Sequence, residues 1–141
     1  MAEIRHFLII NVSPEKVFQA VTEQDGLSSW WMNETIAKSE VGSVVEFRFG
    51  DRYHVKMRIL KLEKNRRVEW ECLQGEDEWV GTSFIFDLER DNNSTKLRFT
   101  HGDWRQPTDF LDSCNFQWGY YLRSLKLYCE TGEGTPFGGK S

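Results

Sequence analysis

The stretch LDSCNFQWGYYLRSLKLYCE, residues 111–130, decides the fold, because no other stretch of the sequence can form an amphipathic helix of this length. Its apolar residues recur at spacings of three and four, namely Leu111, Cys114, Trp118, Tyr121, Leu122, Leu125 and Tyr128. This spacing places them on one face of an α-helix. The preceding chain is typical of short strands, and a sheet with one apolar face needs a cover. We therefore expect the helix to lie across a curved sheet, with a cavity between the two.

Toward the N-terminus of this helix, the sequence predicts six strands in succession. Apolar and polar residues alternate in the segments 35–38, 43–49, 53–62, 67–73, 79–89 and 96–101, as in strands with one buried face. Short polar turns separate these segments, one of them at Gly50 and Asp51. Strands adjacent in sequence are therefore expected to pair in one antiparallel sheet. Within 79–89, the alternation places Val80 on the inner face and Trp79 on the outer face.

The first part of the chain supplies a seventh strand and two short helices. Residues 3–11 contain the run IRHFLII, which predicts a strand buried on both faces. A helix is expected from Ser13, a suitable N-cap followed by proline, to about Thr22. The Asp-Gly pair at 25–26 is expected to break this helix, and residues 27–31 predict a second short one.

Three stretches carry a family resemblance. They are SPEKVFQAVT at 13–22 followed by Leu27 and Trp30, the segment 58–70 ending in RVEW, and WGYYL at 118–122 followed by SLK and ETG. Together they resemble the START-like (SRPBCC) superfamily, and within it the AHSA-type branch named after the activator of the heat-shock-protein ATPase. The resemblance spans nearly the whole chain. It implies an α+β helix-grip fold: a curved antiparallel sheet of about seven strands, two short helices and a long C-terminal helix over a cavity.

Composition predicts a single soluble domain over residues 1–141, with a glycine-rich tail at 132–141. Aromatic residues make up 14% of the chain, which indicates a bulky core or an aromatic-lined pocket. The net charge of −4 disfavours a nucleic-acid partner. The sequence has no signal-peptide layout and no apolar run long enough to span a membrane, so we expect a cytoplasmic protein without integral membrane association. An open edge strand would allow two copies to pair, so both a monomer and an oligomer fit.

The sequence predicts neither a metal site nor a cofactor. Cys72, Cys114 and Cys129 are odd in number and widely spaced, as expected of reduced thiols in a core. There is no CxxC motif and no histidine pair at ligand spacing. Motifs such as GxSxG and HExxH are also missing, so no catalytic residue is predicted. The carboxylates at 76–78 fall in a predicted turn, which does not give catalytic carboxylates the shelter they need.

Inward-facing aromatic residues are the candidates for the lining of the cavity. The candidate ligand-binding residues are Trp30, Trp31, Phe47, Met57, Trp70, Phe84, Phe86, Phe99, His101, Trp118, Tyr121 and Leu122. The same side chains would also make a packed core, and both interpretations remain open. His101 shares a strand face with Phe99, and its usual pKa of about 6.5 suits acid–base chemistry. A structural histidine at the core edge is the alternative, as is a core role for Tyr121 instead of a ligand anchor.

The two ends of the expected cavity have separate candidates. The loop 102–107 leads from the last strand into the long helix, and Asp103, Arg105 and Asp109 could line a mouth there. Trp104 is the candidate lid, although surface charges on a loop are often only solvated. Leu125 and Tyr128 are expected to seal the other end.

The leading functional hypothesis is the binding of a small, largely hydrophobic or amphipathic molecule in this internal cavity. Two alternatives follow from the family resemblance. One is a protein-interaction module resembling a co-chaperone, with a protein partner and a link to the stress response. The other is a cyclase- or hydrolase-type enzyme that uses His101 as acid or base. The resemblance does not imply one chemistry, because this fold hosts transporters, cyclases, hydrolase-like proteins and co-chaperone domains.

Overall fold

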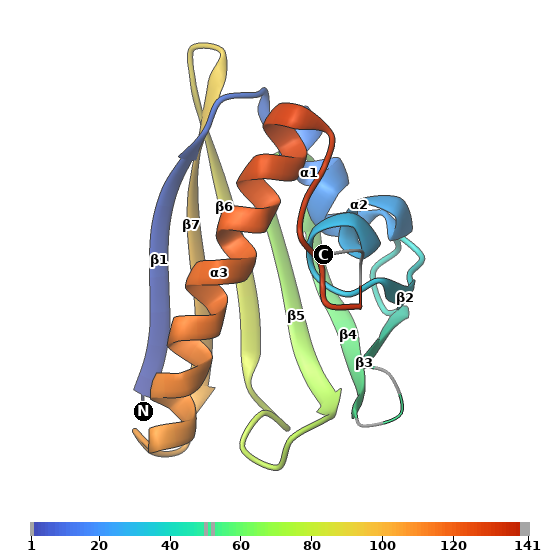
Figure 1. Ribbon diagram of the computed structural model, residues 1–141, viewed down its shortest axis with the longest axis vertical. Coiled ribbons are helices and arrows are strands. Elements are labelled where there is room, and N and C mark those ends of the chain that lie inside the picture. Colours follow the sequence, from blue (N-terminus) through green and yellow to red (C-terminus); the bar gives the residue numbers. More distant parts are fainter. Residues whose placement is uncertain (1, 50, 52, 139–141) are drawn as a thin grey trace.

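A curved antiparallel sheet wraps around one side of a long helix in the computed structural model, which describes residues 2–49, 51 and 53–138 (Figure 1). The strands are β1 (Ala2–Ile10), β2 (Glu34–Ile36), β3 (Val44–Phe49), β4 (Tyr53–Glu63), β5 (Arg67–Gln74), β6 (Ser83–Asp91) and β7 (Ser94–Trp104). The helices are α1 (Pro14–Thr22), α2 (Gln24–Trp30) and α3 (Asp109–Thr131). Within the described residues this confirms the predicted α+β helix-grip fold. Gly50 of one predicted turn and residues 139–141 of the tail lie outside the described residues.

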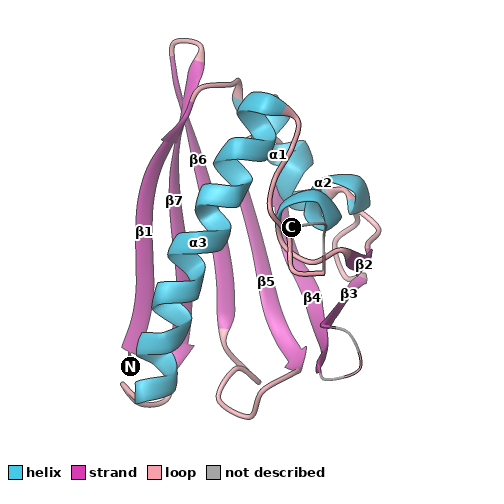
Figure 2. Cartoon of the chain, viewed as in Figure 1, coloured by secondary structure: helices cyan, strands magenta, loops and turns pink. Residues whose placement is uncertain are grey.

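The strand order is β1-β7-β6-β5-β4-β3-β2 among the described residues, so that the first strand pairs with the last. All the other neighbours are consecutive in sequence and joined by short connections. Figure 2 shows α3 running diagonally across the sheet, with α1 and α2 grouped beside its C-terminal end. This arrangement leaves β1 and β2 as the edges and gives the sheet one covered face.

The first strand is buried on one face only, and the prediction of burial on both faces is wrong. Ile4 and Ile10 are buried, whereas Phe7 is 57% and Ile9 is 44% exposed. Because side chains alternate along a strand, the covering helix can bury only every second residue. The apolar run therefore belongs to an edge strand whose outer face is also apolar.

The break between α1 and α2 falls earlier than predicted. Glu23 has an extended backbone (φ −92°, ψ 149°), and α2 begins at Gln24, so Gly26 lies inside the second helix. A Cβ atom on Gly26 would lie 2.6 Å from the Cα atom of Ala20. Glycine at this position thus permits the two short helices to touch, and it does not act as a helix breaker.

The long helix α3 extends beyond the predicted stretch 111–130 at both ends and runs from Asp109 to Thr131. The Thr108 side chain caps it by accepting a hydrogen bond of 3.1 Å from the Leu111 amide. Gly132 ends it in the left-handed conformation, with φ of 90°. Its 23 residues extend over about 34 Å. None of the described helices is long and apolar enough to cross a membrane.

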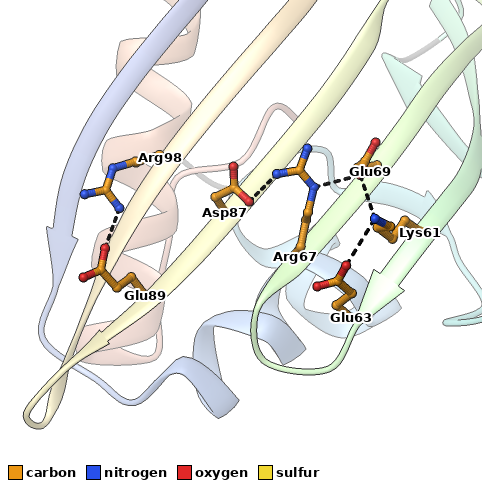
Figure 3. Close-up of polar contacts among 7 residues, drawn as sticks. All are labelled: Lys61, Glu63, Arg67, Glu69, Asp87, Glu89 and Arg98. Atoms are coloured by element: carbon orange, nitrogen blue, oxygen red, sulfur yellow. Dashed lines mark hydrogen bonds and ion pairs between the residues drawn. The ribbon is translucent and has the colours of Figure 1, made fainter.

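The outer face of the sheet carries a ladder of ion pairs across its strands (Figure 3). The Arg67 guanidinium donates to Asp87 at 2.6 Å and to Glu69 at 2.7 Å. Neighbouring strands add a pair between Arg98 and Glu89 at 2.8 Å. These partly exposed side chains mark a solvated surface, so the concave face beneath α3 is the place to seek a site.

Candidate functional site

A hollow opens between α3, the turn that precedes β6 and the C-terminal tail. It has a volume of about 370 Å³, within the range of small-molecule pockets of roughly 300–1,000 Å³. Its lining consists of Trp31, Val55, Glu76, Trp79, Phe110, Cys114, Gln117, Trp118, Tyr121 and Phe137. Apolar and aromatic side chains dominate this lining, as in most sites that bind small molecules. We call this hollow the aromatic pocket.

Three of the twelve predicted site residues, Trp31, Trp118 and Tyr121, line the aromatic pocket. The other nine do not line the pocket and, like Trp31 and Trp118, are at most 2% exposed: Trp30, Phe47, Met57, Trp70, Phe84, Phe86, Phe99, His101 and Leu122. Trp70, for example, stacks on Trp31 with ring centroids 6.1 Å apart and meets Phe86 at 5.2 Å. These nine side chains are packed in the core of the protein, next to the residues that line the pocket.

Trp79 is the lining residue that the sequence pattern misplaced most clearly. The predicted strand 79–89 begins only at Ser83, because the backbone turns where the Trp79 and Val80 amides both bond to the Glu76 carbonyl. The turn reverses the two faces, so that Trp79 is 9% exposed and Val80 is 39% exposed. The turn interrupts the strand alternation before Ser83, so the pattern of β6 does not apply to Trp79 and Val80.

The remaining lining residues gave weaker signals. Cys114 was part of the apolar stripe of the long helix, and Gln117 lies beside that stripe. Glu76 lies in the predicted turn of carboxylates, and in the folded chain it borders the pocket. Phe137 lies in the tail, where no periodic pattern exists to identify it. Only the folded chain brings these residues together.

Trp79 and Trp118 are tied together by a buried chain of hydrogen bonds. The Trp118 indole N–H donates to Nδ1 of His101 at 3.1 Å. Because Nδ1 accepts, the neutral ring carries its proton on Nε2, which donates to the Thr82 hydroxyl at 2.9 Å. That hydroxyl donates in turn to the carbonyl of Trp79 at 2.5 Å. The chain fixes one histidine tautomer and anchors both tryptophans.

His101 is therefore placed as a positioning residue and does not touch the aromatic pocket. It is 0% exposed, and its ring lies 3.9 Å from that of Phe84. Burial lowers the pKa of His101 to about 3, so the ring is neutral at physiological pH. Both ring nitrogens are occupied within the protein. A general base needs a free nitrogen near the substrate, so this geometry disfavours the enzyme hypothesis based on His101.

The wall of the pocket next to α3 is closed by a contact between Trp79 and Cys114. The Trp79 indole N–H donates to the Cys114 sulfur at 3.4 Å, and the Trp79 ring stacks on Trp118 at 6.5 Å. Burial raises the pKa of the Cys114 thiol to about 11. A thiol in this state is a poor nucleophile at neutral pH. Cys114 thus forms part of the pocket wall and accepts the hydrogen bond from Trp79.

Polar groups at the rim are few and carry no positive charge. They are the Glu76 carboxylate, the Gln117 amide and the Tyr121 hydroxyl. Burial raises the pKa of Tyr121, which keeps its hydroxyl neutral. No Lys or Arg occurs among the described residues that line the pocket. The rim can therefore accept hydrogen bonds and attract positive charge, and it is poorly suited to anions.

The loop before α3 does not form the predicted mouth with a lid. Trp104 still belongs to β7 and is 1% exposed, so it is a core residue. Arg105 braces the neighbouring turn by donating to the carbonyls of Asp77 at 2.7 Å and Val80 at 3.2 Å. Asp103 accepts from the Ser83 hydroxyl at 2.9 Å. The strand continues to Trp104, further than predicted, and its alternation is interrupted at Asp103, which has a φ of 65° and lies where the register with β1 shifts. This irregularity turns Trp104, the expected lid, to the buried side.

The C-terminal tail closes the side of the pocket that faces α2. The Phe137 amide donates to the Trp31 carbonyl at 2.8 Å, and the Phe137 carbonyl accepts from the Asn33 amide at 2.9 Å. The Ser124 hydroxyl donates to the Trp30 carbonyl at 2.7 Å. Tyr128 and Leu125, the predicted seal, do not line the pocket in the described chain. The C-terminal tail, through Phe137, closes the pocket in place of these two residues.

No cluster of three or more His, Cys, Asp or Glu side chains with metal-binding geometry exists among residues 2–49, 51 and 53–138. Cys72 and Cys114 are buried free thiols, and Cys129 is half-buried. The arrangement is that of a preformed, mainly aromatic hollow. Ring contacts and a few acceptor groups are what it offers to a ligand.

Comparison with known proteins gives a consistent family assignment. The family model described as activator of Hsp90 ATPase homolog 1-like protein matches residues 11–130. The solution structure of the Aha1 dimer from Colwellia psychrerythraea is 40% identical, with a TM-score of 0.86, over 95% of this chain and 100% of that chain. No protein of curated function matches the sequence.

More distant structures share the fold alone. Protein SSP2350 from Staphylococcus saprophyticus is 21% identical, with a TM-score of 0.79, over 95% of this chain and 96% of that chain. Protein MLL2253 from Mesorhizobium loti is 16% identical, with a TM-score of 0.82, over 92% of this chain and 97% of that chain. At these identities the likeness carries no information about ligands.

Proposed function

Because this chain belongs to the family of activator of Hsp90 ATPase homolog 1-like proteins, a START-like family, we propose that it binds a small, mainly apolar molecule in the aromatic pocket. The observation that carries the proposal is the hollow of about 370 Å³ lined by Trp31, Trp79 and Trp118. Hydrogen bonds within the protein hold Trp79 and Trp118 in place. A preformed pocket loses little entropy on binding, which favours affinity.

The lining also suggests the class of ligand. Apolar and aromatic side chains make up most of the lining, which suits an aromatic ring system. The Glu76 carboxylate attracts a positive group, and the lining carries no positive charge to balance a carboxylate. The preferred ligand is thus an aromatic molecule with a neutral or positively charged polar end.

Three probes of similar shape test this class directly: 1-naphthylmethylamine as the cation, 1-naphthalenemethanol as the neutral form and 1-naphthoic acid as the anion. We expect the cation and the alcohol to bind at least about tenfold more tightly than the acid, which corresponds to about 1.4 kcal/mol. Calorimetric titration gives the dissociation constants. A ligand present at about a hundred times its dissociation constant should also raise the stability by about 2.7 kcal/mol.

The variant Glu76→Gln tests the origin of the selectivity. We expect it to weaken binding of the naphthylmethylammonium ion and to leave the alcohol unchanged. Asp77→Asn is the matched control, because Asp77 lies in the same turn, is exposed and does not line the pocket. Equal binding of all three probes, or equal effects of the two variants, would refute the proposed charge preference. Failure of all three probes to bind would refute the proposed site.

Self-association is a second candidate function, and it gives a specific form to the protein-interaction alternative. The observation in its favour is that the relative from Colwellia psychrerythraea, 40% identical over its whole length, was solved as a dimer. Light scattering at several protein concentrations measures the mass in solution. The expected result is twice the monomer mass of 16.6 kDa.

The co-chaperone alternative has its own test. The family description names an activator of the Hsp90 ATPase, so the relevant measurement is the ATPase rate of a purified chaperone of that class with and without this protein. A rate that does not change would remove this alternative and would leave the pocket proposal untouched.

A further inference from the structure

We propose that two copies of this chain pair through the outer face of α3, antiparallel to each other across a two-fold axis. The outer face is the side of the helix that points away from the sheet, and it consists of Asp112, Phe116, Gly119, Tyr120, Arg123 and Leu127. This inference rests on the self-association proposed above and assigns a surface to it. Figure 1 shows α3 in front of the sheet, with this side toward the viewer.

The first observation is the exposure of two aromatic rings on this helix. Phe116 is 78% exposed and Tyr120 is 50% exposed. Residues four apart lie on the same side of a helix, so the two rings form one patch. Single exposed apolar residues are common, but a contiguous aromatic patch on a folded surface is typical of an interaction site.

The second observation is a hollow of about 450 Å³ beside the patch. It is lined by Phe116, Gln117, Tyr120, Tyr121, Thr135, Pro136, Phe137 and Gly138. A two-fold interface places the same patch on both partners, so the surface must be complementary to itself. Phe116 and Tyr120 border this hollow, so the surface offered to a second copy has a recess beside the two rings.

The third observation is a glycine in the middle of the helix. A Cβ atom on Gly119 would meet only the Cε1 atom of His6, at 3.8 Å, which is an ordinary contact distance. The packing of the chain itself therefore does not require glycine there, although glycine destabilises a helix interior relative to alanine. Close approach of a second helix supplies a reason, because the separation of packed helices depends on the side chains at their contact.

The order of residues along α3 selects the antiparallel arrangement. Asp112 and Arg123 are equally distant from the midpoint between Gln117 and Trp118, on opposite sides of it. An axis through that midpoint places Asp112 of one copy opposite Arg123 of the other. Neither side chain has an ion-pair partner within the described residues. Opposite charges at this position favour the antiparallel pairing over a parallel one.

The same axis brings Phe116 opposite Gly119. These two residues are also equally distant from the midpoint between Gln117 and Trp118. The absence of a side chain on Gly119 leaves room for the Phe116 ring of the second copy. One axis thus accounts for the exposed ring, the glycine and the unpaired charges together.

The other exposed apolar surface, on β1, is a weaker candidate. The Arg98 guanidinium lies 5.3 Å from the centre of the Phe7 ring and covers part of it. The backbone edge of β1 is also engaged, because Lys126 donates to the Ile9 carbonyl. Glu130 accepts from the neighbouring Asn11 amide. Edge strands protected in this way are poor templates for pairing.

Sedimentation velocity over a range of concentrations tests the assigned surface with Phe116→Glu and the matched control Phe7→Glu. Both changes place a carboxylate on an exposed aromatic position, 78% and 57% exposed. We expect the wild type and Phe7→Glu to form dimers, and Phe116→Glu to raise the dimer dissociation constant at least about a hundredfold. Unchanged binding of 1-naphthalenemethanol relative to a wild-type monomer at high dilution shows that the variant is folded.

The outcomes separate the two proposals. A wild-type protein that stays monomeric at 200 μM, a concentration chosen for the experiment, overturns self-association and this inference with it. A dimer that Phe116→Glu leaves intact overturns only the assigned surface. Asp112→Arg should weaken the dimer, and adding Arg123→Asp should restore it. A double variant as weak as the single one overturns the antiparallel pairing.

Discussion

His101 is the residue at which burial, tautomer and pocket structure depend on one another. Its two nitrogens link the Trp118 indole to the Thr82 hydroxyl, and the chain ends on the Trp79 carbonyl. A protonated ring cannot accept from Trp118. The hydrogen bond from Trp118 therefore requires the neutral form of His101. Protonation of His101 should destabilise the folded chain, so the pKa of His101 can be followed through the pH dependence of the free energy of unfolding.

The depressed pKa of His101 predicts how stability changes with pH. The unfolded chain binds a proton at a pKa near 6.5, whereas the folded chain binds it only near 3. Between these values the unfolded state holds more protons, so the free energy of unfolding falls as the pH is lowered. We expect a loss of about 1.5 kcal/mol from this residue between pH 6.5 and 5, measured by urea unfolding.

The variant His101→Phe removes the titrating group and retains a ring against Phe84. We expect it to lose about 2–3 kcal/mol at pH 7, because Trp118 and Thr82 lose buried hydrogen-bond partners. Its stability should depend less on pH between 5 and 6.5. The wild type, measured in the same buffers, is the reference for the slope. An unchanged slope in His101→Phe would contradict the assignment.

At the scale of elements, the C-terminal tail is part of the pocket because Gly134 lets it approach the body of the protein. A Cβ atom on Gly134 would lie 2.6 Å from the Ser29 carbonyl oxygen and 3.0 Å from the Trp30 Cα atom. Both are backbone atoms, which cannot rotate away. The contacts of Phe137 with Trp31 depend on this approach.

The variant Gly134→Ala should therefore displace the tail and open one side of the pocket. We expect binding of 1-naphthalenemethanol to weaken about five- to tenfold, with a stability loss of about 1–2 kcal/mol. Gly119→Ala is the control: a Cβ atom fits there, so pocket affinity should stay at its wild-type value. Calorimetric titration of both variants with 1-naphthalenemethanol measures the two affinities. An unaffected affinity in Gly134→Ala would mean that the tail does not form the pocket wall.

Periodic elements were predictable from the sequence, and irregular ones were not. The spacing of Trp118, Leu122 and Leu125 identified α3 and its inner face, since helix geometry alone determines it. Trp79 was misplaced because a turn reverses the alternation there. Phe137 joined the site through contacts with a distant segment, and no local pattern reports such contacts. The hydrogen-bond chain through His101 likewise needs residues from three separate elements.

For the whole molecule, α3 separates the two proposed functions on its two sides. Trp118 on its inner side completes the wall of the aromatic pocket. Phe116 on its outer side is exposed and belongs to the surface assigned to a second copy. Gln117 and Tyr121 lie between them and border both hollows. The helix thus places the proposed ligand site and the proposed dimer contact next to each other.

The indole N–H resonances of the tryptophans provide the most direct test of the central claim, that the aromatic pocket is the ligand site. The chain has six tryptophans. Trp31, Trp79 and Trp118 line the pocket, whereas Trp30, Trp70 and Trp104 do not. In proton–nitrogen correlation spectra, titration with 1-naphthylmethylamine should shift the first three resonances and move the other three much less. Six unshifted resonances at saturating probe, or larger shifts at Trp30 and Trp104 than at Trp79 and Trp118, would contradict the account.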